Sequence, residues 1–304
     1  MPPSPPAPQN TPRTAVPPRV PFPEQRRPGC PWCGSARLRT RAVATCRDCG
    51  HVFHHRVHRP DHLEDYADQA LSARAVRRRH RAAARAVLPL AEPESWLDVG
   101  TGDARFPQTA REVFPYTSFD GLDPTPRVIE AQRAGRIEEA HQGHLTAPEI
   151  QYRLRCRYDV VSMFHHLEHT ADPRAELRAA LGVLRPGGHL LVQAADPRSA
   201  FAALLGGRWA PHDPARHLNL LPRDNLRADL RARGCTVLAA DRGHLPHDLS
   251  GAVLLTLGPA LGRAAAPLTA AASVLDRALS PFLRHTPFAN TYRVIARKGT
   301  SGGR

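Results

Sequence analysis

The amino-acid sequence predicts an α/β protein with a doubly wound, largely parallel sheet and a small cysteine-rich module ahead of it. Three observations support this prediction. From about residue 93 onward, short apolar strand-like runs alternate with helical segments, as a doubly wound sheet requires. The first of these runs ends in the turn Asp98-Val-Gly-Thr-Gly102, where a helix begins. Two Cys-x-x-Cys pairs precede the alternating region.

The net charge and the amino-acid composition indicate which kinds of binding partner the protein could have. The chain has 304 residues and a formal net charge of +14, which ordinarily favours nucleic acid. Lys298 is the only lysine, however, so nearly every basic side chain is Arg, and Ala and Pro are abundant. A GC-rich genome imposes such a bias whatever the partner, and nucleic acid is therefore disfavoured. No run approaches the roughly 20 apolar residues of a transmembrane helix, and the N-terminus has no apolar signal core, so we expect the cytoplasm.

The N-terminal part divides in two. Residues 1–28 are rich in Pro and carry few large apolar side chains, so we expect a disordered tail. Residues 29–58 hold the two Cys-x-x-Cys pairs, each followed by a glycine, with a gap long enough for a hairpin. Two such knuckles close a tetrahedral Zn²⁺ site that leaves no coordination position for chemistry. A redox dithiol would need a thioredoxin-like unit, which this pattern lacks. The predicted zinc ligands are Cys30, Cys33, Cys46 and Cys49.

The sequence between the second knuckle and the first strand of the sheet has a less specific pattern. With four thiolates available, the histidines that follow the second knuckle (His51, His54 and His55) are expected on the surface. Residues 59–92 show apolar side chains at helical spacing and are predicted to form a helical linker or lid. The basic run 77–81 within it is expected to be a solvated face.

Residues 93–304 are expected to form one α/β domain. Strands are predicted at 95–99, 117–122, 136–140, 158–163, 188–195, 235–240 and 291–297, the last at an edge. Helices are predicted near 105–113, 126–134, 173–184 and 223–233. Asp172 is the predicted N-cap of the third helix, and Gly187-Gly188 its terminator. An Ala- and Leu-rich insert at about 249–285 is expected to be helical and broken at Pro259, Pro267 and Pro281. This insert could serve as a substrate lid, as a dimer surface or as a helix on a membrane surface.

An ordered set of motifs carries a family resemblance. They are Leu97-Asp-Val-Gly-Thr-Gly102, Asp159-Val-Val161, Leu167-Glu-His169, Asp172-Pro173, Leu184-Arg-Pro-Gly-Gly188 and His217-Leu218 after Trp209. This set resembles the class I S-adenosylmethionine-dependent methyltransferases, roughly over residues 93–240 and more loosely from Cys30 to Lys298. The resemblance implies a Rossmann-like, seven-stranded methyltransferase sheet with an N-terminal zinc ribbon. An NAD or FAD fingerprint is disfavoured because Arg105 stands where its third glycine would be.

The resemblance assigns cofactor-binding residues at the carboxyl ends of the strands, where ligands bind in open parallel sheets. The glycine turn is assigned to the amino-acid tail of S-adenosylmethionine, and Asp123 to the ribose diol. Leu145 is expected to flank the adenine, although His144 stands where the family often has an acid. The full predicted set is Asp98, Gly100, Thr101, Gly102, Asp123, Leu145 and Phe164. The plain structural alternatives are turn-capping roles for Asp98 and for Asp123, which precedes Pro124.

A base for the acceptor is sought among the histidines, whose pKa lies near neutrality. The family repeatedly has a Glu-His pair and a later His-Leu, matched here by Glu168-His169 and His217-Leu218. His217 is the preferred candidate, followed by His166 and His169. Glu168 as a ligand of a divalent ion, similar to an acid in quinone-type O-methyltransferases, is a disfavoured alternative.

The sequence thus favours a methyltransferase that acts on a small molecule such as a sugar or a secondary metabolite. The first alternative is an RNA methyltransferase that uses the ribbon and the Arg clusters to bind RNA. The second is a non-catalytic binding protein that retains the fold. The ribbon is expected to be structural or substrate-positioning, with a core separate from that of the cofactor domain, and a homodimer is one arrangement the insert would permit.

Overall fold

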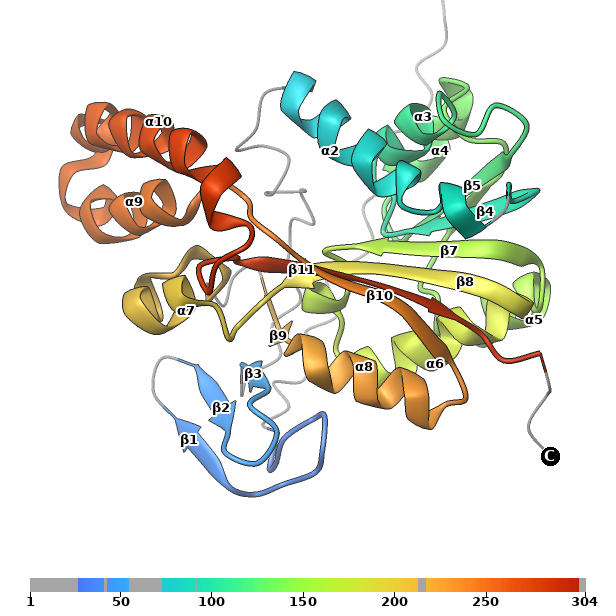
Figure 1. Ribbon diagram of the computed structural model, residues 1–304, viewed down its shortest axis with the longest axis horizontal. Coiled ribbons are helices and arrows are strands. Elements are labelled where there is room, and N and C mark those ends of the chain that lie inside the picture. The colour runs from blue at the N-terminus through green and yellow to red at the C-terminus, as the bar shows by residue number, and fades with distance from the viewer. Residues whose placement is uncertain (1–26, 41–42, 55–72, 91, 213–216, 301–304) are drawn as a thin grey trace, which may run out of the picture.

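A seven-stranded mixed sheet forms the centre of the computed structural model, which describes residues 27–40, 43–54, 73–90, 92–212 and 217–300 (Figure 1). The strand order is β10-β11-β8-β7-β4-β5-β6. Pairing is parallel from β8 through β6, and antiparallel where β11 joins β8 and β10. The bounds are β4 Ser95–Val99, β5 Ser118–Asp123, β6 Ala140–Gln142, β7 Tyr158–Phe164, β8 Leu184–Ala195, β10 Thr236–Gly243 and β11 Thr291–Arg297. The predicted α/β fold with a doubly wound sheet is therefore confirmed.

The structure differs from the sequence-based expectation in several places. The strand predicted at 136–140 is β6, at Ala140–Gln142. The last strand, β11, is not an edge strand, because it lies between β8 and β10. Most of its residues are buried, whereas those of β10 are half-buried or exposed, so β10 is the strand suited to the edge. The third helix also ends earlier than expected, at Val183. Gly187 and Gly188 lie inside β8 instead of terminating the helix.

Helices cover both faces of the sheet. In Figure 1, α2 (Ala73–Arg85), α3 (Arg105–Ala110) and α4 (Arg127–Arg133) lie on one face, and α6 (Pro173–Val183) and α8 (Arg223–Ala232) on the other. Helix α5 (Pro148–Leu154) contacts α6. Helix α6 begins as predicted, since Asp172 accepts hydrogen bonds from the backbone N–H groups of Arg174 and Ala175. Residues 59–72 of the expected linker lie outside the described residues. The part that follows them contains the helix α2.

An aromatic cluster fills the core beneath α2 and α3. Trp96 in β4 is fully buried, and its ring lies 5.5–5.7 Å from those of Phe106, Phe114 and Phe119. The Trp96 indole N–H donates to Ser162 in the neighbouring strand, 2.9 Å away, so its polar atom is satisfied. These contacts hold β4, the strand that leads into the glycine turn, in place.

The cysteine-rich segment forms a second, four-stranded sheet in the order β1-β2-β3-β9. The predicted hairpin between the knuckles is present as β1 (Leu38–Thr40) and β2 (Ala44–Cys46), followed by β3 (Val52–Phe53). The fourth strand, β9 (Asn219–Leu220), comes from the α/β domain and pairs with β3. Buried residues of the ribbon belong to the same apolar cluster as the interior of the large sheet, so the expectation of a separate core is wrong.

Two histidines of the ribbon also differ from expectation. His51 is fully buried and His54 is 9% exposed, so they are not surface residues. His51 packs against the rings of Trp32 and Phe53, because a neutral imidazole can fill apolar space beside aromatic side chains. His55 lies outside the described residues.

The predicted helical insert is a hairpin of two helices. Helix α9 (Asp248–Leu261) and helix α10 (Ala266–Leu283) are joined by a short 3₁₀ turn, Gly262–Ala265. Pro259 and Pro281 lie inside the helices and do not break them, and Pro267 lies in the first turn of α10, where a proline is tolerated. The remaining short elements are α7 (Ala200–Leu205) and the 3₁₀ turns Leu88–Leu90, Leu167–His169, Gly206–Arg208 and Ala210–His212. Among the described residues, no helix is both long and apolar enough to cross a membrane.

Gly121 in β5 provides a test of this packing. A Cβ at this position would lie 2.7 Å from Thr101 Cγ2 and 2.8 Å from Ile137 Cδ1. We therefore expect Gly121→Ala to lower the free energy of unfolding by about 1–3 kcal/mol, as overpacking does. Gly258→Ala in α9 is the matched control, since its nearest neighbour would be 3.4 Å away and alanine favours a helix. Urea denaturation measures both; equal stabilities would contradict the packing described.

Candidate active site and metal centre

The predicted glycine turn lies at the carboxyl ends of β4 and β5. Gly100 and Gly102 have φ angles of +73° and +51°, a region that glycine adopts without strain. The backbone N–H of Gly102 donates to Asp123 Oδ2 at 3.0 Å, and the N–H of Thr125 donates to Asp123 Oδ1 at 2.8 Å. The structure thus brings Gly100, Thr101, Gly102 and Asp123 together.

The turn offers unsatisfied polar groups to a ligand. Thr101 Oγ1 is buried and has no hydrogen-bond partner among the described residues. Asp123 is buried, and while its Oδ1 accepts from both the N–H and Oγ1 of Thr125, its Oδ2 accepts only from Gly102 and retains a lone pair. A Cβ at Gly100 would lie 2.7 Å from His166 Nδ1, so the imidazole of His166 stands directly over the turn. These residues fit a ligand that carries hydroxyl groups and an amino-acid moiety.

The other three predicted cofactor residues make interior contacts. Asp98 accepts a hydrogen bond from Ser162 Oγ at 2.5 Å, within the sheet. Leu145 is fully buried in the main apolar cluster. The ring of Phe164 lies 4.4 Å from that of Phe106. Their contact with a cofactor stays a prediction.

A buried carboxylate, Glu168, is the centre of a second group of side chains. Its Oε1 accepts from the Ala195 backbone N–H at 2.8 Å and lies 3.2 Å from His165 Nδ1, while Oε2 is buried without a partner. Burial opposes ionisation, but the hydrogen bond from His165 and the potential of the nearby histidines lower the pKa of Glu168 to about 2. A negative charge is therefore held inside the protein, facing His169 and His217.

His217 lies beside this carboxylate. Its Nδ1 is 3.0 Å from the carbonyl oxygen of Pro211, and its ring centroid is 5.0 Å from that of His169. A carbonyl only accepts, so Nδ1 carries the proton and Nε2 holds the lone pair of the neutral ring. Burial, reinforced by His169, lowers the pKa of His217 to about 3. The structure brings His217 and His169 together, as a candidate pair for proton transfer.

His166 belongs to a different part of the site. It covers the glycine turn, and its Nε2 lies 3.5 Å from Glu176 Oε2. Burial works against the charged ring, yet the Glu176 carboxylate raises the pKa of His166. Sequence reasoning missed Glu176 and did not select His165 from the histidines that follow the fourth strand, because single polar residues near a helix start or strand end carry no pattern. The positive φ of His165, +52°, was equally invisible in the sequence.

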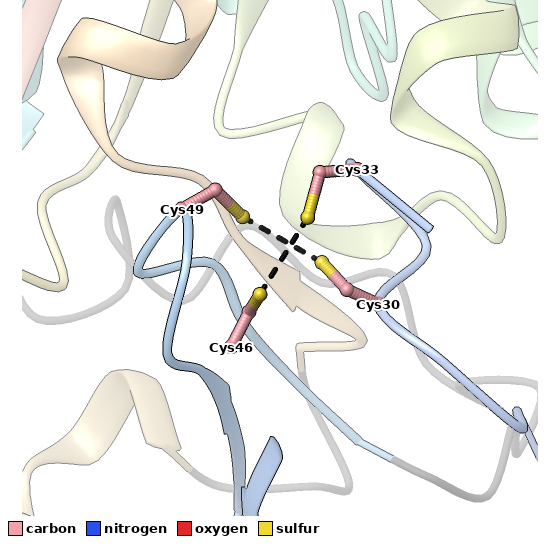
Figure 2. A group of neighbouring side chains, drawn as sticks. All are labelled: Cys30, Cys33, Cys46 and Cys49. Atoms are coloured by element: carbon pink, nitrogen blue, oxygen red, sulfur yellow. Dashed lines mark hydrogen bonds between the residues drawn. The ribbon is translucent and has the colours of Figure 1, made fainter. Parts of the chain in front are cut away.

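The four predicted zinc ligands converge (Figure 2). The Sγ atoms of Cys30 and Cys49 are 3.6 Å apart, those of Cys33 and Cys46 are 3.5 Å apart, and all four lie within 4.8 Å of one another. Tetrahedral Zn²⁺ with Zn–S bonds of about 2.3 Å separates its sulfurs by roughly 3.8 Å. The donor set and its spacing therefore fit a structural Zn²⁺. His51 Nδ1, 3.7 Å from Cys30 Sγ, is placed to orient that ligand.

Backbone contacts join the cysteine cluster to the histidine site. The His54 N–H donates to the Leu218 carbonyl at 3.1 Å, and the Leu218 N–H donates to the Glu168 carbonyl at 2.7 Å. The Cys49 carbonyl accepts from Asn225 Nδ2 at 3.0 Å. His217 thus lies two residues before β9, the strand that pairs with the ribbon.

Comparison with known proteins agrees with this geometry. A family model described as "Methyltransferase domain" matches residues 68–240, more than half of the chain. The chain belongs to this methyltransferase family. Its sheet is that of the class I S-adenosylmethionine-dependent methyltransferases, and the fold implies this cofactor.

The similarities to individual proteins cover smaller parts of the chain or lie at low sequence identity. A ubiquinone biosynthesis O-methyltransferase of Marinobacter nauticus is 38% identical over 69 residues, 22% of this chain and 26% of that protein. Its counterpart in Alkalilimnicola ehrlichii is 28% identical over 133 residues, 42% and 50% of the two chains. The methyltransferase described here thus spans half the length of these curated relatives or less. A chain in the complex between the Haloferax volcanii Trm112 methyltransferase activator and a methyltransferase shares the fold, with a TM-score of 0.53, 17% identity, and coverage of 81% and 100%.

Zinc content tests the cysteine cluster. We expect about one Zn²⁺ per chain, and its loss in Cys46→Ser, because three thiolates no longer close the site. Since the ribbon shares its core with the sheet, the same change should lower the melting temperature of the whole protein. Cys156→Ser, at an exposed cysteine outside the cluster, is the control. Full zinc content in Cys46→Ser would refute the assignment.

Stability should depend on pH through two half-buried histidines, His217 and His247. Burial lowers the pKa of His217 to about 3 and that of His247 to about 4, from an ordinary value of 6.5. Below pH 6.5 the unfolded chain takes up protons that the folded one does not, so the free energy of unfolding falls as the pH drops toward 4. Each ring contributes at most about 1.4 kcal/mol per pH unit.

The measurement is urea denaturation at several pH values between about 7 and 5. His247→Gln should reduce the slope of stability against pH. The control His285→Gln, at an exposed ring, should retain the original slope. A slope unchanged by His247→Gln would show that this ring is not kept neutral by the fold.

Proposed function

We propose that this protein transfers a methyl group from S-adenosylmethionine to a small-molecule acceptor, such as a sugar or a secondary metabolite. Family membership supports the chemistry, and the curated relatives, named as O-methyltransferases of ubiquinone biosynthesis, favour a small acceptor with a hydroxyl group. The observation that carries the proposal is the joint placement of the glycine turn with Asp123 and the Glu168–His217 group near the carboxyl ends of the parallel strands.

In this proposal the glycine turn and Asp123 bind the cofactor. Backbone at Gly100 and Gly102 approaches the amino-acid tail, and Thr101 Oγ1 gains the partner it lacks. Asp123 accepts hydrogen bonds from the two ribose hydroxyls, one at the free position of Oδ2 and one in place of Thr125 Oγ1 on Oδ1. S-adenosylmethionine supplies an activated methyl group on a sulfonium, so alignment of the acceptor is the main task left to the protein.

His217 is the proposed base. Its tautomer places the lone pair on Nε2, and its low pKa keeps the ring neutral and able to accept a proton at neutral pH. The same low pKa makes His217 a weak base by itself. The charge on Glu168 compensates for this, because a buried carboxylate stabilises the imidazolium as it forms. His169 packs against His217 and keeps its ring in place.

Replacement of Asp123 tests cofactor binding. We expect Asp123→Ala to weaken S-adenosylmethionine binding by about 1.5–3 kcal/mol, the scale of a lost charge-assisted hydrogen bond. Isothermal titration calorimetry measures this directly. Asp241→Ala, at an exposed carboxylate of the edge strand, should bind as the wild type does. An unchanged dissociation constant for Asp123→Ala would leave Asp123 as a turn residue only.

Replacement of His217 tests the base. We expect His217→Ala to reduce turnover by about 10²- to 10⁴-fold with little change in cofactor affinity. His166→Ala should instead raise the cofactor dissociation constant, since its ring covers Gly100. Wild-type turnover in His217→Ala between about pH 6 and 9 would show that the acceptor atom is already nucleophilic and needs no base.

The decisive experiment offers labelled S-adenosylmethionine together with a metabolite extract or with total RNA. Label transferred to small molecules supports the proposal. Label transferred to RNA, with a steep loss of binding as salt rises, would replace it with the RNA alternative. Tight cofactor binding without transfer to either pool would indicate a non-catalytic binding protein.

A further inference from the structure

The α9–α10 hairpin exposes an unusual amount of apolar surface. On α10, Leu268, Leu275 and Phe282 recur every seven residues and are 51%, 49% and 75% exposed, so they lie along one face of the helix. Leu254 and Leu261 show the same spacing on α9, with 42% and 46% exposure. Figure 1 shows the hairpin beyond the end of the sheet where β10 ends and β11 begins. Exposed apolar side chains that gather on one element often mark a site of interaction with a protein or a membrane.

Exposed charge on the hairpin is of one sign. The only acids in residues 248–285 are Asp248 and Asp276, and both are buried. Arg277 and Arg284 are exposed and also seven residues apart. At 100° per residue they lie on the side of α10 opposite Leu275 and Phe282. An apolar face backed by an arginine face is the pattern of a helix that lies in a membrane interface.

The two buried acids fix the hairpin with its apolar face outward. Asp276 of α10 accepts from the backbone N–H groups of Leu249 and Ser250 at the start of α9, at 3.1 and 2.9 Å. Asp248 accepts from Trp209 Nε1 at 2.7 Å and Asn290 Nδ2 at 2.6 Å, which tie α9 to the body of the protein. Because these hydrogen bonds hold the inner side of the hairpin against the rest of the protein, the exposed leucines cannot rotate inward.

We propose that the α9–α10 hairpin docks on the surface of an anionic lipid membrane. The apolar side chains enter the boundary between headgroups and acyl chains, and the arginines are attracted by the negative surface potential across a distance comparable to one Debye length. Charge complementarity selects this occupant over a second copy of the chain, because Arg277 and Arg284 are exposed while both acids of the hairpin are buried, so a second hairpin offers these arginines no exposed negative charge. Neither helix can cross the bilayer, so the contact lies in the plane of the interface. Nothing in this inference depends on the proposed methyl transfer.

The test is co-sedimentation of the full chain with two kinds of vesicle. One is pure phosphatidylcholine, and the other contains about a quarter of phosphatidylglycerol, enough for a negative surface potential. We expect binding to the anionic vesicles that weakens as salt rises. The double variant Leu275→Ser, Phe282→Ser should bind at least about tenfold more weakly, because it removes apolar area from the inserted face. Arg277→Glu with Arg284→Glu should abolish the preference for anionic lipid.

Matched controls separate this effect from a general change in the surface. Tyr116→Ser with Tyr152→Ser removes two side chains that are 88% and 89% exposed outside the hairpin, and vesicle binding should not change. Light scattering coupled to gel filtration measures the oligomeric state of each variant. Failure of the wild type to bind anionic vesicles would overturn the proposal, as would equal binding by Leu275→Ser, Phe282→Ser. A dimer of the wild type that this double variant dissociates would assign the patch to a second copy instead.

Discussion

The pairing of β3 with β9 is the contact on which the proposed acceptor side of this protein depends. It is short, with Val52 opposite Leu220 and Phe53 opposite Asn219. Yet it joins a strand of the ribbon to the residues that directly follow His217. The chain from Leu218 then returns to Glu168 through a backbone hydrogen bond. Backbone hydrogen bonds therefore connect the cysteine cluster to the base candidate and to the buried carboxylate. A metal ion bound by the four cysteines would help to fix the position of His217.

Buried acids do most of the long-range organisation. Glu168 is held by Ala195 at the end of β8 and by His165, so its charge is fixed at the point where histidines from two segments meet. Asp248 and Asp276 act likewise in the hairpin, where they satisfy backbone and side-chain donors of a neighbouring element. Each of these carboxylates is inaccessible to solvent and would be costly to bury without its partners. Such groups specify one arrangement of elements that are otherwise joined mainly by apolar contacts.

The cofactor side and the acceptor side are built in different ways. The glycine turn and Asp123 follow two adjacent strands and need mainly local geometry, so their pattern can be recognised in the sequence. The proposed acceptor side draws on the ribbon, the turn that contains Glu168 and the segment that runs from His217 into β9. These pieces come from distant parts of the chain.

The sequence by itself determined the features that depend on local spacing. Alternating strands and helices, the Asp172 cap, the glycine turn and the paired cysteines could all be recognised because each is set by neighbouring residues and by backbone geometry. Contacts between distant segments were not recognisable. Nothing near residue 291 shows that β11 inserts between β8 and β10, and nothing near His51 shows that it is buried beside Cys30. The same holds for β9 completing the sheet of the ribbon and for Glu176 approaching His166. Only the tertiary structure decided these contacts. Strand order and burial follow from the packing of the whole chain, because elements far apart in the sequence form hydrogen bonds with one another and bury apolar area against one another.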